Sequence, residues 1–202
     1  MTVRIKICGI TRVEDARCAV ELGADVIGLN FYPPSPRALS LEQAQAIREA
    51  IGSRCEIAGV FVNAPRAYIA ERLSALRLDL LQFHGDEDET ALRGWPVKVI
   101  RALRLKDGVA PDARPHGGAD YLLLDSFHPA LYGGAGRARP LDAFAGYDLS
   151  RVYISGGLAP DNVAAAARLK PFGVDVASGV ESAPGIKDAA RMRSFIANAK
   201  SA

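Results

Sequence analysis

Short apolar runs alternate along the chain with longer segments in which apolar residues recur at helical spacing. Eight runs are rich in Val, Ile and Leu, and most do not alternate with polar residues. Such runs are typical of strands that are covered on both faces, as in a parallel sheet. The predicted strands cover residues 3–8, 26–31, 57–62, 80–83, 97–102, 121–124, 152–154 and 174–177.

Several segments between these runs are amphipathic and begin with a helix start signal. Thr11 precedes the first of these segments, Ser40 precedes the second, and Pro160 stands early in the fourth. Ser and Thr side chains favour N-cap positions, and Pro is favoured in the first turn. The predicted helices cover residues 12–22, 41–51, 65–76, 160–169 and 188–199.

Alternating strands and helices predict a parallel α/β fold. Eight units in 202 residues leave about 25 residues per unit, near the lower limit for a closed (β/α)8 barrel. The connections at 108–118 and 128–140 are rich in Gly, Ala and Pro and predict poor helices, so an open doubly wound sheet with fewer strands is the alternative. No linker divides the chain, and we expect one (β/α)8 TIM barrel domain over residues 1–202.

Composition excludes several classes of protein. Hydrophobic residues make up 49% of the chain, and the net charge of +2 is too balanced for an electrostatic nucleic-acid binder. The three cysteines, Cys8, Cys18 and Cys55, have no C-x-x-C spacing, which argues against a disulfide framework or zinc cluster. The N-terminus does not resemble a signal peptide, and no apolar stretch is long enough to span a membrane. We expect a cytoplasmic protein without nucleic-acid or membrane partners.

A parallel barrel carries its chemistry on the loops that follow the carboxyl ends of its strands. Polar or catalytically competent residues follow nearly every predicted strand, although a stable scaffold does not need them there. The shared position of these residues after the strands predicts a functional site at this end of the barrel. These residues are Cys8, Asn30, Arg37, Asn63, His84, Arg101, Asp125, Gly156, Gly157, Ser178 and Gly179.

Each of these residues also has a structural interpretation. Cys8 is compatible with a buried small hydrophobe, Asp125 with a turn cap and Arg37 with a solvated surface residue. His84 precedes an acidic run at 86–89 that a metal site would explain, but the run is better explained as the first turn of a helix. Cys18 and Cys55 are expected to be packing residues.

Glycine-containing loops follow the last two strands. A lone Gly-Gly pair usually marks a turn, but the loops after strands seven and eight form the recurrent phosphate site of such barrels. Gly156, Gly157 and Gly179 leave backbone N–H groups free to face an anion, and Ser178 adds a hydroxyl. The pattern therefore predicts a phosphorylated small-molecule substrate.

The motif Lys-Ile-Cys-Gly-Ile-Thr at 6–11 resembles the opening of the phosphoribosylanthranilate isomerase family. The resemblance continues in order over nearly the whole chain. It includes Gly-Leu-Asn-Phe from Gly28, Ser-Pro-Arg at 35–37, Gly-Val-Phe-Val-Asn from Gly59, Gln-Phe-His-Gly-Asp-Glu from Gln82, Leu-Leu-Leu-Asp-Ser ending at Ser126, Gly-Gly-Ala-Gly at 133–136, Ser-Gly-Gly-Leu at 155–158 and Ala-Ser-Gly-Val-Glu-Ser at 177–182.

The resemblance implies an Amadori rearrangement in tryptophan biosynthesis, without a metal or organic cofactor. Phosphoribosylanthranilate, an aminoaldose, becomes the aminoketose 1-(2-carboxyphenylamino)-1-deoxyribulose 5-phosphate. On the family pattern, Cys8 is the general base and Asp125 the general acid, which must be held partly protonated.

The resemblance also assigns binding residues. Arg37 is expected to bind the anthranilate carboxylate, for which a guanidinium fork is suited. Gly156, Gly157, Ser178 and Gly179 are expected to bind the phosphate. Three features depart from the family pattern: Ala135 replaces Thr in the glycine loop, residues 137–141 replace an aromatic-rich stretch, and Ala177 replaces Ser. These departures affect loop closure and one phosphate hydroxyl.

Two other functions stay open on the residues alone. One is another phosphate-binding barrel enzyme, either a sugar-phosphate epimerase, which needs metal-liganding His and Asp residues, or an aldolase, which needs a Schiff-base lysine. Lys6 and Lys98 lie within predicted strands. The other is a non-catalytic phosphate-binding module, which does not explain Cys8 and Asp125 together. A second substrate, such as a phosphorylated imidazole aminoaldose, is compatible with the same pair. We expect a monomer, with a homodimer as the alternative.

Overall fold

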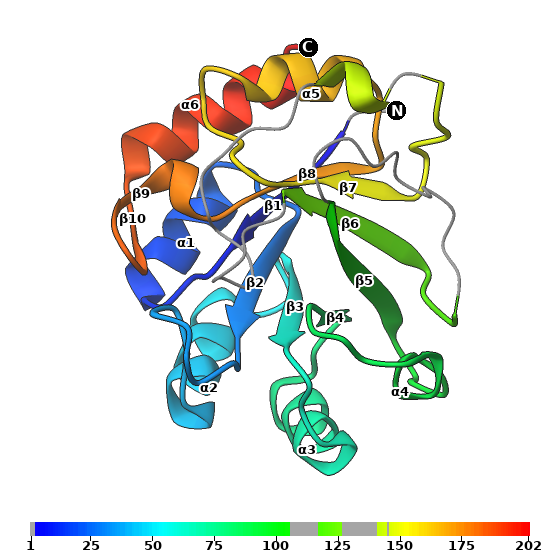
Figure 1. Cartoon of the computed structure of the whole chain (residues 1–202). Coiled ribbons are helices and arrows are strands. Elements are labelled where there is room, and N and C mark those ends of the chain that lie inside the picture. Colours follow the sequence, from blue (N-terminus) through cyan, green and yellow to red (C-terminus); the bar gives the residue numbers. More distant parts are fainter. Residues whose placement is uncertain (1–2, 106–116, 127–140, 145) are drawn as a thin grey trace.

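Eight parallel strands form a closed barrel in the computed structural model, which describes residues 3–105, 117–126, 141–144 and 146–202 (Figure 1). Each strand pairs with the next along the chain, and β1 pairs with β8 to close the barrel. The predicted (β/α)8 barrel is confirmed, and the open-sheet alternative is wrong. The strands are β1 (Arg4–Cys8), β2 (Val26–Asn30), β3 (Glu56–Phe61), β4 (Leu80–Phe83), β5 (Lys98–Leu105), β6 (Tyr121–Ser126), β7 (Val152–Ile154) and β8 (Gly173–Val176).

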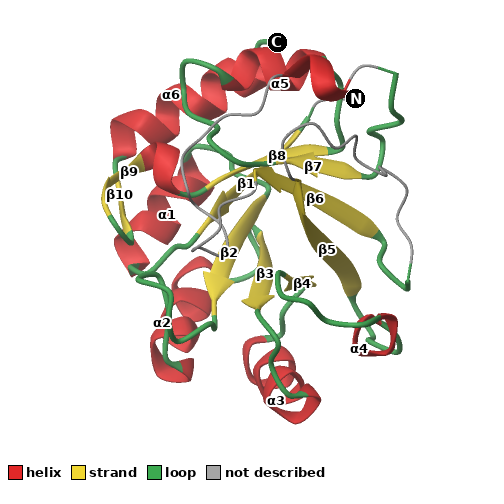
Figure 2. Cartoon of the chain, in the orientation of Figure 1, coloured by secondary structure: helices red, strands yellow, loops and turns green. Residues whose placement is uncertain are grey.

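Helices lie outside the barrel and cover its strands (Figure 2). Ser40 starts α2 as predicted: its hydroxyl accepts from the Gln43 N–H, and the Gln43 side chain accepts from the Ser40 N–H. This reciprocal capping box satisfies two backbone donors that the helix itself leaves unpaired. The helices are α1 (Val13–Glu21), α2 (Leu41–Ile51), α3 (Arg66–Leu76), α4 (Glu89–Leu92), α5 (Val163–Arg168) and α6 (Ala189–Lys200), with 3-10 turns at η1 (Leu141–Phe144) and η2 (Ser178–Val180).

Buried side chains form two separate clusters because successive strand residues point to opposite faces. The larger cluster lies between the strands and helices and includes Ile5, Ile7 and Ile27. The smaller one fills the inside of the barrel with residues from the other face of the strands: Val26, Ala58, Leu80, Ile100, Ala102, Leu123 and Tyr153. The strands are therefore apolar on both faces, which explains why they do not alternate with polar residues.

Two predicted helix starts are wrong. The N-cap of α1 is Arg12, with no side-chain capping bond, and the Thr11 hydroxyl donates to the carbonyl oxygen of Gly185 instead. Helix α5 begins at Val163, so Pro160 lies in the turn before the helix. In the first case a contact with a distant segment replaces the local cap.

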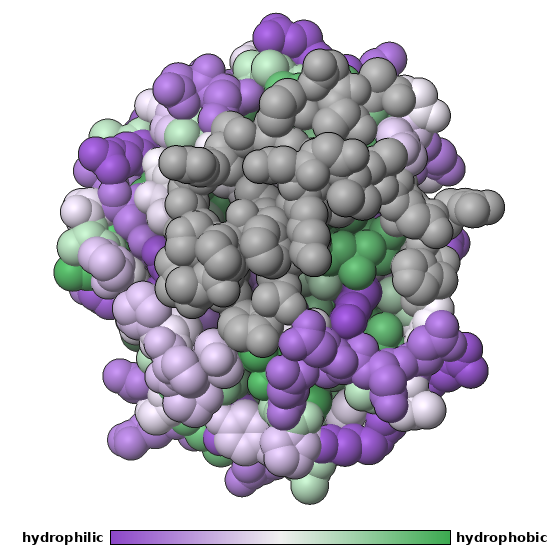
Figure 3. Space-filling model, in the orientation of Figure 1, coloured by the Kyte–Doolittle hydropathy of each residue, from purple (hydrophilic) through white to green (hydrophobic). Residues whose placement is uncertain are grey.

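A short antiparallel hairpin, β9 (Glu181–Ala183) and β10 (Ile186–Lys187), lies between η2 and α6 and was not expected from the sequence. The connections predicted at 108–118 and 128–140 fall almost wholly outside the described residues, as does the glycine motif at 133–136 with Ala135. Within the described ranges, no helix is both long and apolar enough to cross a bilayer. Hydrophilic side chains make up much of the margin of the face shown in Figure 3.

Candidate active site

A cavity of about 390 Å³ opens at the carboxyl ends of the strands. This volume lies within the usual range for a small-molecule site. Several residues that follow the predicted strands therefore meet in one cavity. Residues predicted to be functional that line the cavity are Cys8, Arg37, Asp125, Gly156, Gly157 and Ser178.

Cys8 is the last residue of β1 and is partly exposed in the cavity. Gly28 of β2 lies directly beside it: a Cβ at Gly28 would be 2.8 Å from the Cys8 sulfur. Burial raises the pKa of the Cys8 thiol, whereas the positive charges of Lys6 and Lys187 act in the opposite direction. The thiol therefore favours its protonated form, and Lys6 and Lys187 are placed to stabilise a thiolate.

A buried ion pair beneath Cys8 was missed in the sequence. Lys6 Nζ donates to Asp175 Oδ1 at 2.6 Å, and Ser155 Oγ donates to the other oxygen of this carboxylate at 2.9 Å. Lys6 and Asp175 are paired in register across β1 and β8, and Lys6 is fully buried. Burial alone would lower the pKa of Lys6, but the Asp175 carboxylate outweighs it and raises the pKa. Lys6 is thus charged two residues before the thiol.

Asp125 enters the cavity from β6 and is 4% exposed. The Nε2 atom of His84 lies 3.5 Å from an Asp125 carboxylate oxygen. The Nδ1 atom of the same ring is joined to the Gln82 amide at 3.1 Å. His84 Nε2 has no hydrogen-bond partner among the described residues. Asp125 and His84 thus lie next to each other in one wall of the cavity.

Arg37 lies across the backbone of Gly9. A Cβ at Gly9 would be 2.4 Å from Arg37 Cδ, and Gly9 has a φ of +70°. The absence of a side chain at Gly9 therefore leaves the space that the arginine side chain fills. The guanidinium forms two hydrogen bonds with Glu181, which sequence reasoning did not assign, although the residue lies within the quoted motif at 177–182.

The two glycine loops lie side by side at the rim. Gly156 and Gly157 have φ values of +83° and +67°, a backbone conformation that glycine adopts without steric cost. The Asn162 side chain holds the loop by donating to the Gly157 carbonyl at 2.9 Å and accepting from Ala159 N at 2.8 Å. Neither the Gly156 nor the Gly157 N–H donates to another described residue.

Gly179 differs from the other predicted phosphate residues because it is not part of the cavity lining. It packs against the preceding loop, and a Cβ there would lie 2.0 Å from the Leu158 carbonyl oxygen. Ser178, at the start of η2, does line the cavity. Gly179 therefore allows the two loops to touch, and Ser178 is the member of this loop that faces the site.

The acidic run at 86–89 leads into a helix, as expected. It also forms contacts with a residue that follows β4 and with a residue of β5. Asp88 caps α4 by accepting from Ala91 N at 3.0 Å. Glu87 lies before the helix, accepts from the Gly85 N–H and pairs with Arg101 at 2.8 Å. In the part of the chain that the structure describes, no three His, Cys, Asp or Glu side chains are grouped so as to hold a metal ion.

The closed barrel and its rim cavity define the class of (β/α)8-barrel enzymes. The family model described as N-(5'phosphoribosyl)anthranilate (PRA) isomerase matches residues 5–198. An N-(5'-phosphoribosyl)anthranilate isomerase from Pseudomonas fluorescens is 46% identical over 197 residues, which cover 96% of this chain and 97% of that protein. The chain therefore belongs to the phosphoribosylanthranilate isomerase family.

Solved structures agree with this assignment. A phosphoribosyl anthranilate isomerase from Thermus thermophilus superposes with a TM-score of 0.88 at 37% identity, covering 98% of this chain and 99% of that one. A second phosphoribosyl anthranilate isomerase, in complex with reduced 1-(o-carboxyphenylamino)-1-deoxyribulose 5-phosphate, superposes with a TM-score of 0.83 at 34% identity and covers all of both chains.

Proposed function

We propose that this protein converts N-(5'-phosphoribosyl)anthranilate into 1-(2-carboxyphenylamino)-1-deoxyribulose 5-phosphate in tryptophan biosynthesis. The observation that carries the proposal is that Cys8 and Asp125 line the same cavity from β1 and β6. The relative that binds a reduced form of this aminoketose supports the substrate class.

The first step opens the ribose ring. Asp125, as a carboxylic acid, protonates the ring oxygen, and the bond between this oxygen and C1′ breaks. The lone pair of the anilino nitrogen forms a double bond to C1′, which gives a protonated Schiff base and leaves Asp125 as a carboxylate. This carboxyl group is 4% exposed and lies 3.5 Å from His84 Nε2 in the cavity wall.

The second step moves a proton from carbon to Cys8. The thiolate removes the hydrogen of C2′, and the electron pair forms a C1′–C2′ double bond and neutralises the nitrogen. The resulting enolamine loses its hydroxyl proton and gains a proton at C1′, which gives the ketone. Lys6 and Lys187 favour the thiolate electrostatically, which offsets part of the effect of burial on the pKa of Cys8.

Substrate binding uses two groups of residues in the cavity lining. The phosphate lies against Gly156, Gly157 and Ser178, where a hydroxyl and N–H groups that donate to no other described residue supply donors. The anthranilate carboxylate binds Arg37 through a charge-assisted fork. Gly179 contributes by holding its loop against Leu158, in place of the direct phosphate contact that the resemblance implied.

The described lysines disfavour an aldolase. Lys6 is buried and paired with Asp175, and Lys187 is buried and paired with Glu181. Lys98 lies outside the cavity lining, paired with Asp120 with its side chain 64% exposed. None of these is an unpaired amine in the cavity, which a Schiff-base mechanism needs.

The test is the loss of phosphoribosylanthranilate fluorescence with protein purified from a host that lacks its own isomerase. We expect turnover that a chelator does not diminish, and its loss in Cys8→Ala and Asp125→Asn. No turnover by the wild-type protein would contradict the proposed function. Turnover of a phosphorylated imidazole aminoaldose in the same assay series would add a second substrate.

We further propose a monomeric, cytoplasmic protein with one domain over residues 1–202. Among the described residues, Ile186 is the exposed large hydrophobic side chain, at 39%, and isolated apolar residues of this kind do not form a dimer interface. Light scattering across a concentration series tests this, since a homodimer would double the mass.

A further inference from the structure

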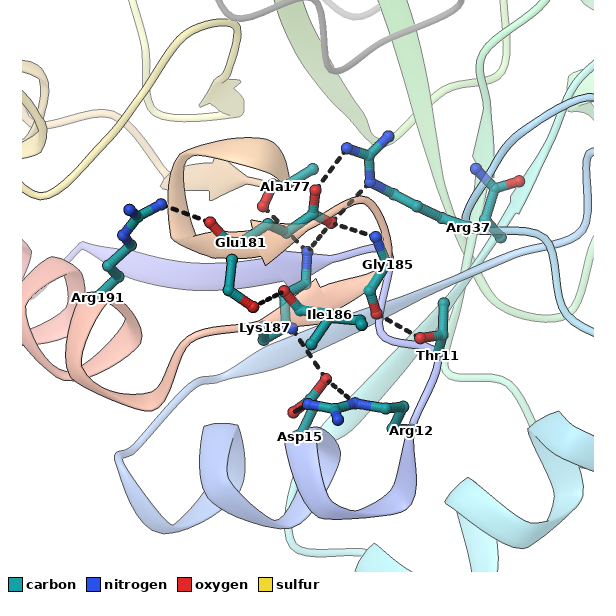
Figure 4. Close-up of polar contacts among 12 residues, drawn as sticks. Thr11, Arg12, Asp15, Arg37, Ala177, Glu181, Gly185, Ile186, Lys187 and Arg191 are labelled. Atoms are coloured by element: carbon teal, nitrogen blue, oxygen red, sulfur yellow. Dashed lines mark hydrogen bonds and ion pairs between the residues drawn. The ribbon is translucent and has the colours of Figure 1, made fainter.

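A largely buried group of three charged residues adjoins the active site and includes Glu181, to which the proposed chemistry gives no role (Figure 4). We call Arg37, Glu181 and Lys187 the Glu181 cluster. Arg37 comes from the loop after β2, whereas Glu181 and Lys187 belong to the hairpin β9–β10. The side chains of these residues are 13%, 5% and 0% exposed, respectively. The cluster therefore lies at the boundary between the cavity and the protein interior.

The contact between Arg37 and Glu181 uses one particular edge of the guanidinium. Arg37 Nε donates to Glu181 Oε1 at 2.8 Å, and Nη2 donates to Oε2 at 2.6 Å. Nη1 points away from Glu181 (Figure 4) and has no hydrogen-bond partner among the described residues. Because a guanidinium is planar with five donors, its other edge, formed by Nη1 and the second hydrogen of Nη2, is left for a ligand.

Lys187 fixes the position of the Glu181 carboxylate. Lys187 Nζ donates to Glu181 Oε1 at 2.8 Å and to the Ala177 carbonyl at 3.0 Å. The Lys187 N–H donates to Asp15 in α1 at 3.0 Å. Burial alone would raise the pKa of Glu181, but the hydrogen bonds and charges of Arg37 and Lys187 outweigh it and lower the pKa. Glu181 is therefore a carboxylate with a fixed orientation.

The Glu181 cluster has more positive than negative side chains. Arg37 and Lys187 are two cationic side chains that share one carboxylate, Glu181, so the three side chains carry a net positive charge beside the cavity. Arg37 also lines the cavity. A ligand with one carboxylate beside the free edge of Arg37 would balance the charge and complete a second fork.

We propose that Glu181 is a positioning residue for substrate recognition: it holds Arg37 so that the free edge of the guanidinium faces the aromatic carboxylate of the substrate. This inference rests on the proposed function, because it names the carboxylate of phosphoribosylanthranilate as the partner. Lys187 supports it by holding Glu181 in place. The cluster thereby selects substrates whose aromatic ring carries a negative charge.

The test compares two substrates in Glu181→Gln: phosphoribosylanthranilate and the corresponding aniline analogue without the carboxylate. The amide keeps the size of the side chain but removes the charge and one acceptor. We expect KM for phosphoribosylanthranilate to rise about tenfold or more, the scale of a charge-assisted hydrogen bond, with a smaller change in kcat. For the aniline analogue, kcat/KM should stay near its wild-type value. Equal losses for both substrates would overturn the proposal.

Two further measurements separate positioning from folding. In an Arg37→Ala background, Glu181→Gln should add little further loss, because the group that it positions is gone; a full additional loss would contradict the proposal. Calorimetric binding of the reduced aminoketose gives the same comparison without turnover, at a temperature where each variant is folded by circular dichroism. Glu181→Asp, which keeps the charge but cannot reach both nitrogens, should show the same substrate dependence if Glu181→Gln does not fold.

A matched control is Glu56→Gln, which removes a carboxylate paired with Arg4 outside the cavity lining. It should leave KM for both substrates unchanged. The outcomes distinguish the proposed function from the proposed role of Glu181. An inactive wild-type protein contradicts the proposed function, whereas an active wild-type protein whose Glu181→Gln variant loses no preference for the carboxylate contradicts this inference alone.

Discussion

Lys6 Nζ and Asp175 Oδ1 lie 2.6 Å apart inside the barrel, across the seam where β1 meets β8. Removing one member of a buried pair leaves an uncompensated charge, which costs about 3–5 kcal/mol. We expect Asp175→Asn to lower the free energy of unfolding in urea by about this amount. Replacing both residues, as Lys6→Met with Asp175→Leu, should recover a large part of the loss.

The control for this pair is Glu89→Gln. Glu89 pairs with Arg93 on the surface, where both side chains are more than half exposed, and such pairs contribute about 1 kcal/mol or less. If Asp175→Asn were no more destabilising than Glu89→Gln, the buried pair would not be ionised as described.

The proposed acid and base give a second prediction. Cys8→Ala and Asp125→Asn should each fold normally and each lose a factor on the order of 10² or more in kcat/KM, because each removes a positioned proton donor or acceptor. Cys8→Ser should be almost as poor, since a hydroxyl is too weak an acid to supply the base. Steady-state kinetics measure this, and near-normal turnover by Cys8→Ala would contradict the mechanism.

The pH dependence follows from the direction of the Cys8 shift. Burial raises the pKa of this thiol, and the base must be the thiolate, so kcat/KM should still be rising with pH at about 8.5, where an ordinary thiol is half ionised. Lys6 lowers the pKa of Cys8, so Lys6→Met should move this rising limb to higher pH. The pH dependence of Cys8 alkylation by iodoacetamide measures the same group directly. A limb at or below the ordinary thiol value would contradict the assignment.

Arg37→Ala tests the carboxylate fork. The loss should be about 1.5–3 kcal/mol of transition-state binding, for substrates with the carboxylate only. Glu181 keeps Lys187 as its partner in this variant, so the protein should remain folded. Equal effects on phosphoribosylanthranilate and its aniline analogue would assign Arg37 a structural role instead.

Gly179 gives a prediction about packing. A methyl group there would lie 2.0 Å from the Leu158 carbonyl oxygen, and overpacking of this kind costs about 1–3 kcal/mol. Gly179→Ala should therefore unfold at lower urea concentration and bind inorganic phosphate more weakly, because the two loops separate. Ser178→Ala is the control for stability, since it adds no atoms. Wild-type stability of Gly179→Ala would show that the loops are not in contact.

Much of the fold could be predicted because strand patterns report burial directly. All eight strands form where apolar runs predicted them, and many of the residues after these runs line one cavity. Local start signals were less reliable. Ser40 caps its helix, but Thr11 binds Gly185, which is 174 residues away in sequence. A local rule cannot anticipate a competing partner at that separation.

The site residues that the sequence analysis did not assign were missed for a common physical reason. Lys6 precedes Cys8 by two residues in a buried strand, so the period of two could have placed both inside the barrel. Its partner Asp175 is on a strand with no local signal for the pairing. Glu181 stands within a motif that was quoted, but its contact with Arg37 depends on the unexpected hairpin β9–β10. Such contacts arise from the closed topology, which sequence spacing does not encode.

Because the first and last strands close the barrel, its completion during synthesis depends on the end of the chain. Cys8 leaves the ribosome early, but the Lys6–Asp175 bond spans 169 residues and the Lys187–Asp15 bond spans 172. Until those late residues emerge, the nascent chain has neither the β8 side of the barrel seam nor the Asp175 carboxylate that pairs with Lys6. A chain terminated before β8 also lacks Glu181, the carboxylate that holds Arg37.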